Sequence, residues 1–424
     1  MKENLLHFIW KLKLFSIEKL VSTKGESIQV ISNGTYNLNT GPDFFNAKIE
    51  INKQIWAGNV EIHVKSSDWY KHQHEMDENY DSVILHVVWE HDIEIFRGNN
   101  DKIATLELKN FISKELLSNY NQLFSKNKKW INCEKDIEFI DSFILNNWLE
   151  RLYFERLERK SQFVKQILLK TKNNWEQTLF ILLAKGLGLK VNSEAFLSFA
   201  CSFDYSIVRK VSNNLGQLEA LFFGQAGLLS NEFESVYFNN LKREYEFLKV
   251  KFNLEPISKG QVQFFRLRPN NFPTIRMSQL AFLYNKYQNI FSKTIEIDTL
   301  EKFYELFEIK TSPYWESHYT FETESKKSTK KLTKSFIDLL LINTILPLKF
   351  VHLKSLGNDD FSSIFSIIEQ IKPEKNTIIS NFEELKIKST NAFKTQSLLQ
   401  LKNEYCNKQL CLQCAIGKVV LNKH

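Results

Sequence analysis

Two acidic residues near the N-terminus have the spacing of a carboxylate pair that could bind a metal ion. Asp43 follows a Gly-Pro pair where the chain enters FFNAKIEI, and Glu61 lies inside the alternating run VEIHV. If these runs are neighbouring strands joined around INKQIW, the two carboxylates repel one another unless a cation lies between them. Such oxygen ligands favour Mg²⁺, which can activate water for hydrolysis. The alternative is an ordinary β-hairpin with an Asp in its turn and a solvent-facing Glu.

The residues that follow Glu61 add two further polar groups to the same strand. Side chains alternate along a strand, so Glu61, His63 and Lys65 point to one face. A carboxylate, an imidazole and an ammonium group then line one edge of the sheet. In this arrangement His63 or Lys65 would stabilise charge or position the water.

The polar segment WYKHQHEMDENY contributes two more histidines to this part of the chain. If it is helical, His74 and Asp77 are neighbours, whereas His72 and His74 are not on one face. One interpretation is a transition-metal site that uses His63, His72 or His74. The other is a helix with polar surface residues.

The C-terminal tail EYCNKQLCLQCAIGK has a C-x₄-C-x₂-C spacing at Cys406, Cys411 and Cys414, which are three of the five cysteines in the chain. This is the spacing of the three clustered ligands of plant-type iron–sulfur ferredoxins. Cys133 in KWINCEKDI is the candidate fourth ligand, and Cys201 in AFLSFACSF is predicted to be a buried small apolar residue. Zn²⁺ bound by four cysteines satisfies the same pattern, so zinc, an iron–sulfur cluster and free thiols stay open.

The elements that position these residues follow from the apolar periodicity. Up to about residue 110, alternating or short apolar runs predict strands at SIQVI, FFNAKIEIN, IWAGNVEIHVK, DSVILHVVWEH and TLELK. An amphipathic helix precedes them. From about residue 138 the apolar period becomes that of helices. We therefore predict an α/β domain over residues 1–125, an all-helical domain over 138–400 and a cysteine-rich tail over 401–424.

An arginine-rich stretch, FFRLRPNNFPTIRMSQLAFLY, lies in the helical part. Arg266, Arg268 and Arg276 flank two prolines that stiffen the loop, and guanidinium groups bind phosphates well. This predicts a nucleic-acid contact; a structural loop whose arginines pair with carboxylates such as Glu219 is the alternative. The lysine run ESKKSTKKLTK is either a solvated loop or a further salt-dependent contact with nucleic acid.

Composition sets broad limits on the class of protein. The 424 residues are 43% hydrophobic and 25% charged, as in ordinary globular chains. A net charge of +7 permits DNA or RNA as a partner. Lysines interrupt the apolar N-terminal stretch, and no apolar run reaches the roughly 18–20 residues of a membrane span, so we expect a cytoplasmic protein without a membrane partner. The oligomeric state stays open, and sequence motifs for nucleotide-binding loops and serine hydrolases are absent.

Pro42-Asp43 and Glu61 resemble the PD-(D/E)xK nuclease signature, in which a Pro-Asp opens one strand and a Glu-x-Lys lies on the next. The predicted order of helix, three strands, helix and strand is similar to the restriction-endonuclease-like core. The sequence departs from the signature at His63, which occupies the lysine position, with Lys65 two residues later. The resemblance implies a Mg²⁺-dependent nuclease. One early and three late cysteines also resemble the ligand set of the iron–sulfur nucleases of CRISPR adaptation and recombinational repair, although the spacing differs.

Over nearly its whole length the chain resembles an uncharacterised bacterial family of unknown function, known chiefly from Bacteroidetes. The stretches that carry this resemblance are LLHFIWKLKLF, GPDFFNAKI, WAGNVEIHVKSSDW, FRLRPNNFPTIRMSQLA and YCNKQLCLQCAIG. The family implies no activity. From the residues we expect a Mg²⁺-dependent nuclease or a nuclease-derived nucleic-acid-processing protein. The competing class is a non-catalytic binding or scaffold protein with a structural metal site.

Overall fold

The structure, a computed structural model, describes residues 2–125 and 129–423. The chain divides into two compact units: Met1–Trp148 together with Lys402–His424, and Leu149–Leu401. The first unit contains a mixed β-sheet, and the second is helical. The predicted fold class, an α/β part followed by a large helical region, is confirmed. The cysteine-rich tail belongs to the first unit.

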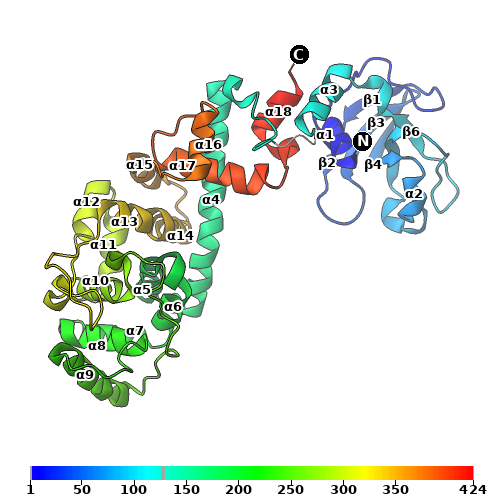
Figure 1. Ribbon diagram of the computed structural model, residues 1–424. Coiled ribbons are helices and arrows are strands. Elements are labelled where there is room, and N and C mark those ends of the chain that lie inside the picture. The colour runs from blue at the N-terminus through cyan, green and yellow to red at the C-terminus, as the bar shows by residue number, and fades with distance from the viewer. Residues whose placement is uncertain (1, 126–128, 424) are drawn as a thin grey trace. The chain divides into compact units, whose positions relative to one another are not determined.

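The first unit (Figure 1) has one sheet flanked by short helices. Its strands are β1 (Ile28–Ser32), β2 (Thr35–Tyr36), β3 (Phe44–Ile51), β4 (Gln54–Lys65), β5 (Val83–Glu90) and β6 (Ala104–Glu107). Its helices are α1 (Glu3–Leu12), α2 (Asp68–Lys71), α3 (Lys114–Leu123), α18 (Ala415–Leu421) and the start of α4 (Ser142–Lys170). Single turns are η1 (His74–Met76), η2 (Glu78–Tyr80), η3 (Leu108–Phe111), η4 (Ile137–Phe139) and η9 (Cys411–Gln413), and the π-helical η8 (Leu401–Cys406) spans the unit boundary.

The strand order is β1-β3-β4-β5-β6, with β2 also paired to β3. Strands β1, β3 and β4 are antiparallel neighbours, whereas β4, β5 and β6 are parallel. A parallel pair needs a crossover connection, and α2, η1 and η2 form the one between β4 and β5. Strand β5 is buried over six consecutive residues, which explains its continuous apolar run.

The β3–β4 hairpin closes through a two-residue loop. Ile51 pairs with Gln54, and the loop residues Asn52 and Lys53 have φ of 49° and 67°. Two successive positive φ angles define a type I′ turn, whose twist matches that of the strands, and Asn tolerates this conformation well. The turn therefore fixes the register from which the rest of the hairpin follows.

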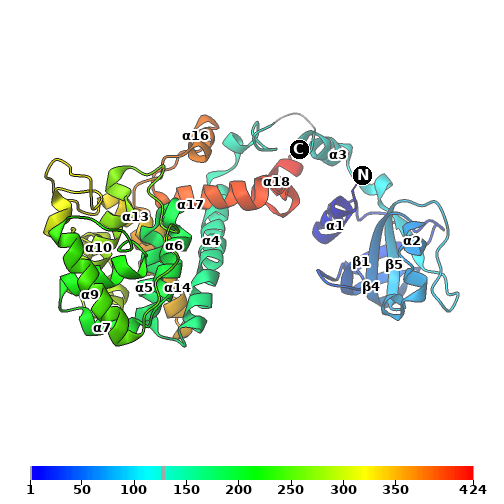
Figure 2. The same cartoon turned by 60° about the horizontal axis from the view of Figure 1, so that its bottom comes forward.

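Helix α1 packs on β4 through the apolar face that its sequence predicts. Leu5, Leu6, Ile9 and Trp10 are fully buried, and Lys13 ends the helix in the left-handed conformation. At the other end of the chain, α18 lies beside α3 (Figure 1, Figure 2), where the Asn119 amide donates to the last carbonyls of the tail at 2.8 and 3.2 Å.

The second unit is a helical array around a large, aromatic-rich core. Its helices, after the remainder of α4, are α5 (Trp175–Leu187), α6 (Leu189–Cys201), α7 (Tyr205–Val211), α8 (Leu215–Gln225), α9 (Val236–Phe252), α10 (Pro273–Lys286), α11 (Ile290–Glu296), α12 (Leu300–Leu306), α13 (Lys334–Leu340), α14 (Leu346–Ser355), α15 (Ser362–Gln370), α16 (Thr377–Glu384) and α17 (Ala392–Gln400). Single turns are η5 (Pro269–Asn271), η6 (Pro313–Glu316) and the π-helical η7 (Leu341–Ile345).

One continuous helix of the second unit, Lys334–Ser355, is long and apolar enough by composition to cross a membrane. It is longer than the sequence suggested because Pro347 lies in the first turn of α14, after the π-helical turn, and does not end it. Within the structure 72% of its most apolar window is buried, so packing in the core accounts for its composition. The expected cytoplasmic location stays a prediction.

Candidate metal centre

A β-bulge in β3 sets the relation between Asp43 and Glu61. Asn46 has a φ of 58°, and the register shifts by one residue between Phe44 and Ala47. Beyond the bulge Phe44 pairs with Val60, so the next position places Asp43 opposite Glu61. Directly opposed residues share one face of a sheet. Bulges that re-aim side chains are frequent beside active sites.

Each of the two carboxylates is held by the backbone of the opposite strand. Glu61 Oε2 accepts the Asp43 N–H at 3.1 Å, and Asp43 Oδ2 accepts the Ile62 N–H at 3.0 Å. Glu61 is 5% exposed. Burial raises its pKa to about 9, and the charge of Asp43 acts in the same direction. The pair therefore binds either a proton or a cation at neutral pH.

Helix α1 contributes a third group, His7, which no motif in the sequence singles out. His7 Nε2 lies 3.0 Å from Asp43 Oδ2, and its Nδ1 lies 3.4 Å from the Tyr36 hydroxyl. Burial acts to lower the pKa of His7, but the hydrogen bond and charge of Asp43 outweigh it, so the net shift is upward. His7 can therefore carry a positive charge beside the carboxylates.

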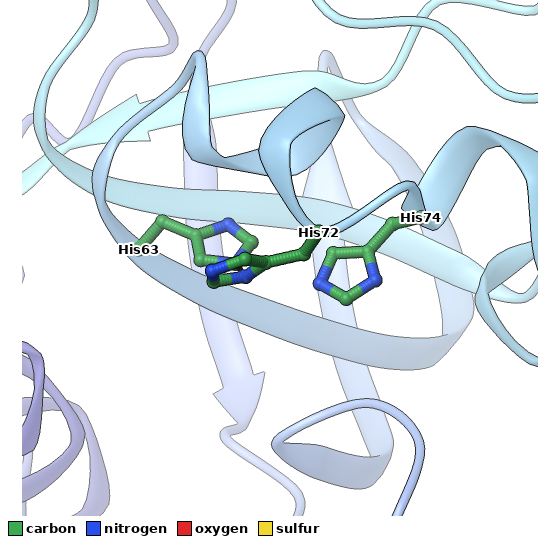
Figure 3. A group of neighbouring side chains, drawn as sticks. All are labelled: His63, His72 and His74. Atoms are coloured by element: carbon green, nitrogen blue, oxygen red, sulfur yellow. Dashed lines mark hydrogen bonds between the residues drawn. The ribbon is translucent and has the colours of Figure 1, made fainter.

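Three histidines, His63, His72 and His74, lie close together near Glu61, and Figure 3 shows their rings. The candidate ligand atoms of His63, His72 and His74 all lie within 4.8 Å of one another. His63 Nε2 is 3.1 Å from His72 Nδ1, and Glu61 Oε1 is 3.5 Å from His63 Nε2 and 3.3 Å from His74 Nε2. Glu61 thus faces Asp43 with one oxygen and the imidazoles with the other.

The meeting of His72 and His74 differs from what a continuous helix would give. Helix α2 ends at Lys71, and Gln73 has a φ of 61°. The left-handed residue turns the chain between the two histidines, so both reach the same centre. The predicted helix is confirmed only over Asp68–Lys71, and its interruption at Gln73 is what brings the ring nitrogens together.

A fourth ring, His86, supports the cluster from strand β5. It is paired with Glu61 in the parallel register, is fully buried, and its Nε2 lies 2.8 Å from His63 Nδ1. Burial and neighbouring imidazoles lower the pKa of His63 to about 2 and that of His86 to about 3. With Nδ1 of His63 donating to Nε2 of His86, the Nε2 lone pair of His63 is available to a metal ion.

Lys65 lies at the exposed end of β4, two residues beyond His63. Its backbone N–H donates to Asp68 Oδ2 at 3.0 Å, which anchors the start of the crossover. The backbone of Lys65 therefore helps to position the start of α2, and its ammonium group lies at the surface.

Cys133, Cys406, Cys411 and Cys414 are the four predicted cysteine ligands of a structural metal. All four lie in the first unit. Burial raises the pKa of the Cys133 thiol, and the nearby thiols of Cys406, Cys414 and Cys411 raise it further. The Asn132 amide lies 3.4 Å from Cys411 Sγ. The thiols of the tail therefore lie close enough to Cys133 to raise its pKa.

The backbone that follows Cys414 lies close to its sulfur. Burial raises the pKa of the Cys414 thiol, and the backbone N–H groups of Ile416 and Gly417 act in the opposite direction. Gly417 packs so closely that an added Cβ would lie 2.1 Å from the Cys411 carbonyl oxygen. Cys201, by contrast, ends α6 in the second unit and is exposed; its predicted burial is wrong because it lies at the last turn of the helix.

The three arginines of the proline-containing loop have different environments. Arg266 and Arg268 are exposed, whereas Arg276 lies in α10 and is 5% exposed. The Arg276 guanidinium stacks 3.6 Å from the centre of the Phe336 ring and donates to Gln279 at 2.8 Å. Arg276 is therefore part of the core of the second unit, and only its two neighbours face solvent.

Contacts in the second unit also show the environments of Glu219 and of the lysine run. Glu219 accepts hydrogen bonds from the hydroxyls of Tyr237 and Ser278, both at 2.6 Å, so these hydroxyls compensate its burial. In the lysine run, Lys330 is 5% exposed and donates to the Glu316 carbonyl at 3.0 Å. The other lysines of the run are exposed.

We expect Arg276→Ala to destabilise the second unit, because it leaves a cavity and removes partners of buried polar groups. The expected loss is about 2–4 kcal/mol of unfolding free energy. Arg266→Ala and Arg268→Ala are the matched controls, since both side chains are exposed. Thermal melts of the three variants measure this. Equal melting temperatures for all three would contradict a structural role for Arg276.

The first unit thus combines a mixed α/β sheet with a carboxylate–histidine centre, and a helical unit follows it. The chain belongs to the family described as "Protein of unknown function (DUF2851)", whose model matches residues 3–377. No curated protein and no solved structure matches the chain.

Proposed function

We propose that this protein is a metal-dependent phosphodiester hydrolase that acts on DNA or RNA, with Asp43 and Glu61 as its metal-binding carboxylates. The observation that carries the proposal is the bulged hairpin register, which opposes the two carboxylates. Each carboxylate accepts a hydrogen bond from the backbone of the opposite strand, which fixes its position. Such preorganisation is what a metal-binding catalytic centre requires.

The order of elements supports the same proposal. Helix α1 is followed by the antiparallel strands β1, β3 and β4, then by α2 and by β5, which is parallel to β4. This order is similar to that of the PD-(D/E)xK nucleases. Asp43 precedes one central strand and Glu61 lies in the next, as the signature of that superfamily requires.

The chain's own residues suit hydrolysis of a phosphodiester. A bound divalent ion would polarise the phosphate and lower the pKa of a water molecule. The lysine position of the signature holds His63, which is neutral and cannot supply a fixed positive charge. His7, beside Asp43, and the exposed Lys65 are the cationic groups that can stabilise the developing charge.

Nucleic-acid binding and a structural metal complete the proposal. The exposed Arg266 and Arg268 are the candidates for phosphate contacts in the second unit. In the first unit, Cys133, Cys406, Cys411 and Cys414 are proposed to bind zinc or an iron–sulfur cluster; four thiolates leave no open position for water, so this metal is structural.

The test is incubation of purified protein with labelled DNA and RNA in the presence of Mg²⁺ or Mn²⁺, with chelator as the control. We expect cleavage that requires the metal ion. If no cleavage of either nucleic acid occurs with any divalent ion, the chain is a binding or scaffold protein and the proposed function fails.

A further inference from the structure

We infer that Glu61, His63, His72 and His74 form a binding site for a divalent transition-metal ion, and that this ion, in place of Mg²⁺, is the one this centre selects. The inference rests on the proposed function, which it deepens by naming the class of ion. It is carried by a separate observation: the ligand atoms of three imidazoles lie together, and two of these rings, His63 and His74, lie against the second oxygen of Glu61.

The spacing of the donor atoms fits one ion of this class. The separations are 3.1 Å from His63 Nε2 to His72 Nδ1, and 3.5 and 3.3 Å from Glu61 Oε1 to the Nε2 atoms of His63 and His74. Ligands bonded at about 2.1 Å to a metal ion lie about 3.0–3.4 Å from one another. These three separations match those of ligands on one ion, and the ligand atoms of the three histidines all lie within 4.8 Å of one another.

The surroundings fix the orientation of these rings. His86 Nε2 binds Nδ1 of His63 at 2.8 Å, which directs Nε2 of His63 toward the centre. The Tyr80 ring stacks on His74 with ring centroids 3.8 Å apart. An imidazole that binds a metal ion through one ring nitrogen is characteristically held by a hydrogen bond at the other nitrogen, and His86 provides that contact for His63.

The donor chemistry selects the ion. Imidazole nitrogen suits zinc, iron, nickel, copper and cobalt, whereas Mg²⁺ prefers oxygen ligands and retains its waters. Glu61 Oε1 adds one anionic oxygen. His72 is exposed while His63 is buried, so the centre is closed toward the sheet and open on the side from which water or a phosphate can approach.

Titration of the full-length protein with Co²⁺ tests the inference without reference to activity. Cobalt bound by nitrogen and oxygen gives weak visible d–d bands, whereas the cysteine set would add a sulfur-to-cobalt charge-transfer band. We expect His72→Ala and His74→Gln to weaken the nitrogen–oxygen site about 10-fold or more and to leave the charge-transfer band unchanged. His318→Gln, in the second unit, is the matched control, and circular dichroism checks that each variant is folded.

The outcomes separate this inference from the proposed function. Bands that titrate identically in wild type, His72→Ala and His74→Gln overturn the metal site, and so does displacement of Co²⁺ by an equal concentration of Mg²⁺. Loss of the bands in the variants, with excess Mg²⁺ unable to displace Co²⁺ from wild type, supports it. If that result occurs and no nucleic acid is cleaved, the metal site stands and the hydrolase proposal fails.

Discussion

Asp43→Asn and Glu61→Gln are each expected to reduce metal-dependent cleavage of DNA or RNA by about 10³-fold or more, because either change removes a negative charge that the metal ion needs. Both substitutions keep the shape of the side chain, so the hairpin and its bulge should persist. Initial cleavage rates at saturating metal measure the effect.

Stability distinguishes loss of chemistry from loss of fold in these variants. The two carboxylates are opposed, and burial with the charge of Asp43 raises the pKa of Glu61 to about 9. Because a Gln side chain has no charge to bury or to neutralise, the metal-free Glu61→Gln protein should be at least as stable as wild type. Wild-type cleavage rates in both variants would show that the cleaving site does not include Asp43 or Glu61.

Cys411→Ser is expected to lose the structural metal and to lower the stability of the first unit substantially. Zinc bound by cysteines can contribute about 10–16 kcal/mol to the folding of a small domain. A bond between Cys133 and the tail also closes a loop of roughly 270 residues, which restricts the unfolded chain. Metal analysis after anaerobic purification gives the identity: a brown protein indicates iron–sulfur, and a colourless one with stoichiometric metal indicates zinc.

Two matched variants sharpen this prediction. Gly417→Ala keeps every thiol, but its Cβ would lie 2.1 Å from the Cys411 carbonyl oxygen, so it should weaken metal binding through geometry alone. Cys201→Ser changes an exposed thiol in the second unit and should behave as wild type. If no metal co-purifies and Cys411→Ser melts at the wild-type temperature, the cysteines are free thiols.

The sequence predicts the hairpin well because its information is local. Alternating apolar residues define both strands, and the Asn52 turn joins them with two residues. The approach of Asp43 to Glu61 follows from this pattern to within one position. The bulge at Asn46 decides the last residue of the register, and its signal, an Asn within a strand, is too weak to predict alone.

The histidine centre depends on contacts that local patterns do not encode. His7 lies one turn after Glu3, away from the buried apolar face of α1, and its position gives no signal of a site. His86 lies in a buried apolar strand, and a polar residue in such surroundings was the available signal. His72 and His74 meet only because Gln73 adopts a left-handed conformation. Spacing along a regular helix would place them apart.

The three arginines show that residue type and spacing do not predict which side chain is buried. Arg266, Arg268 and Arg276 look equivalent in the sequence, yet only Arg276 is buried. Its position in α10 is set by packing against Phe336, more than fifty residues later in the chain. Motif composition predicts the chemistry of a guanidinium group but not whether solvent or phosphate can reach it.

We expect the N-terminal sheet to bind a divalent metal ion between its carboxylates and histidines. Diffraction from crystals grown with Mn²⁺, recorded at the manganese absorption edge, tests it most directly. We expect an anomalous peak about 2.2 Å from a Glu61 oxygen and in contact with Asp43 or the histidine cluster. Ordered density for these side chains without an anomalous peak among them would contradict it.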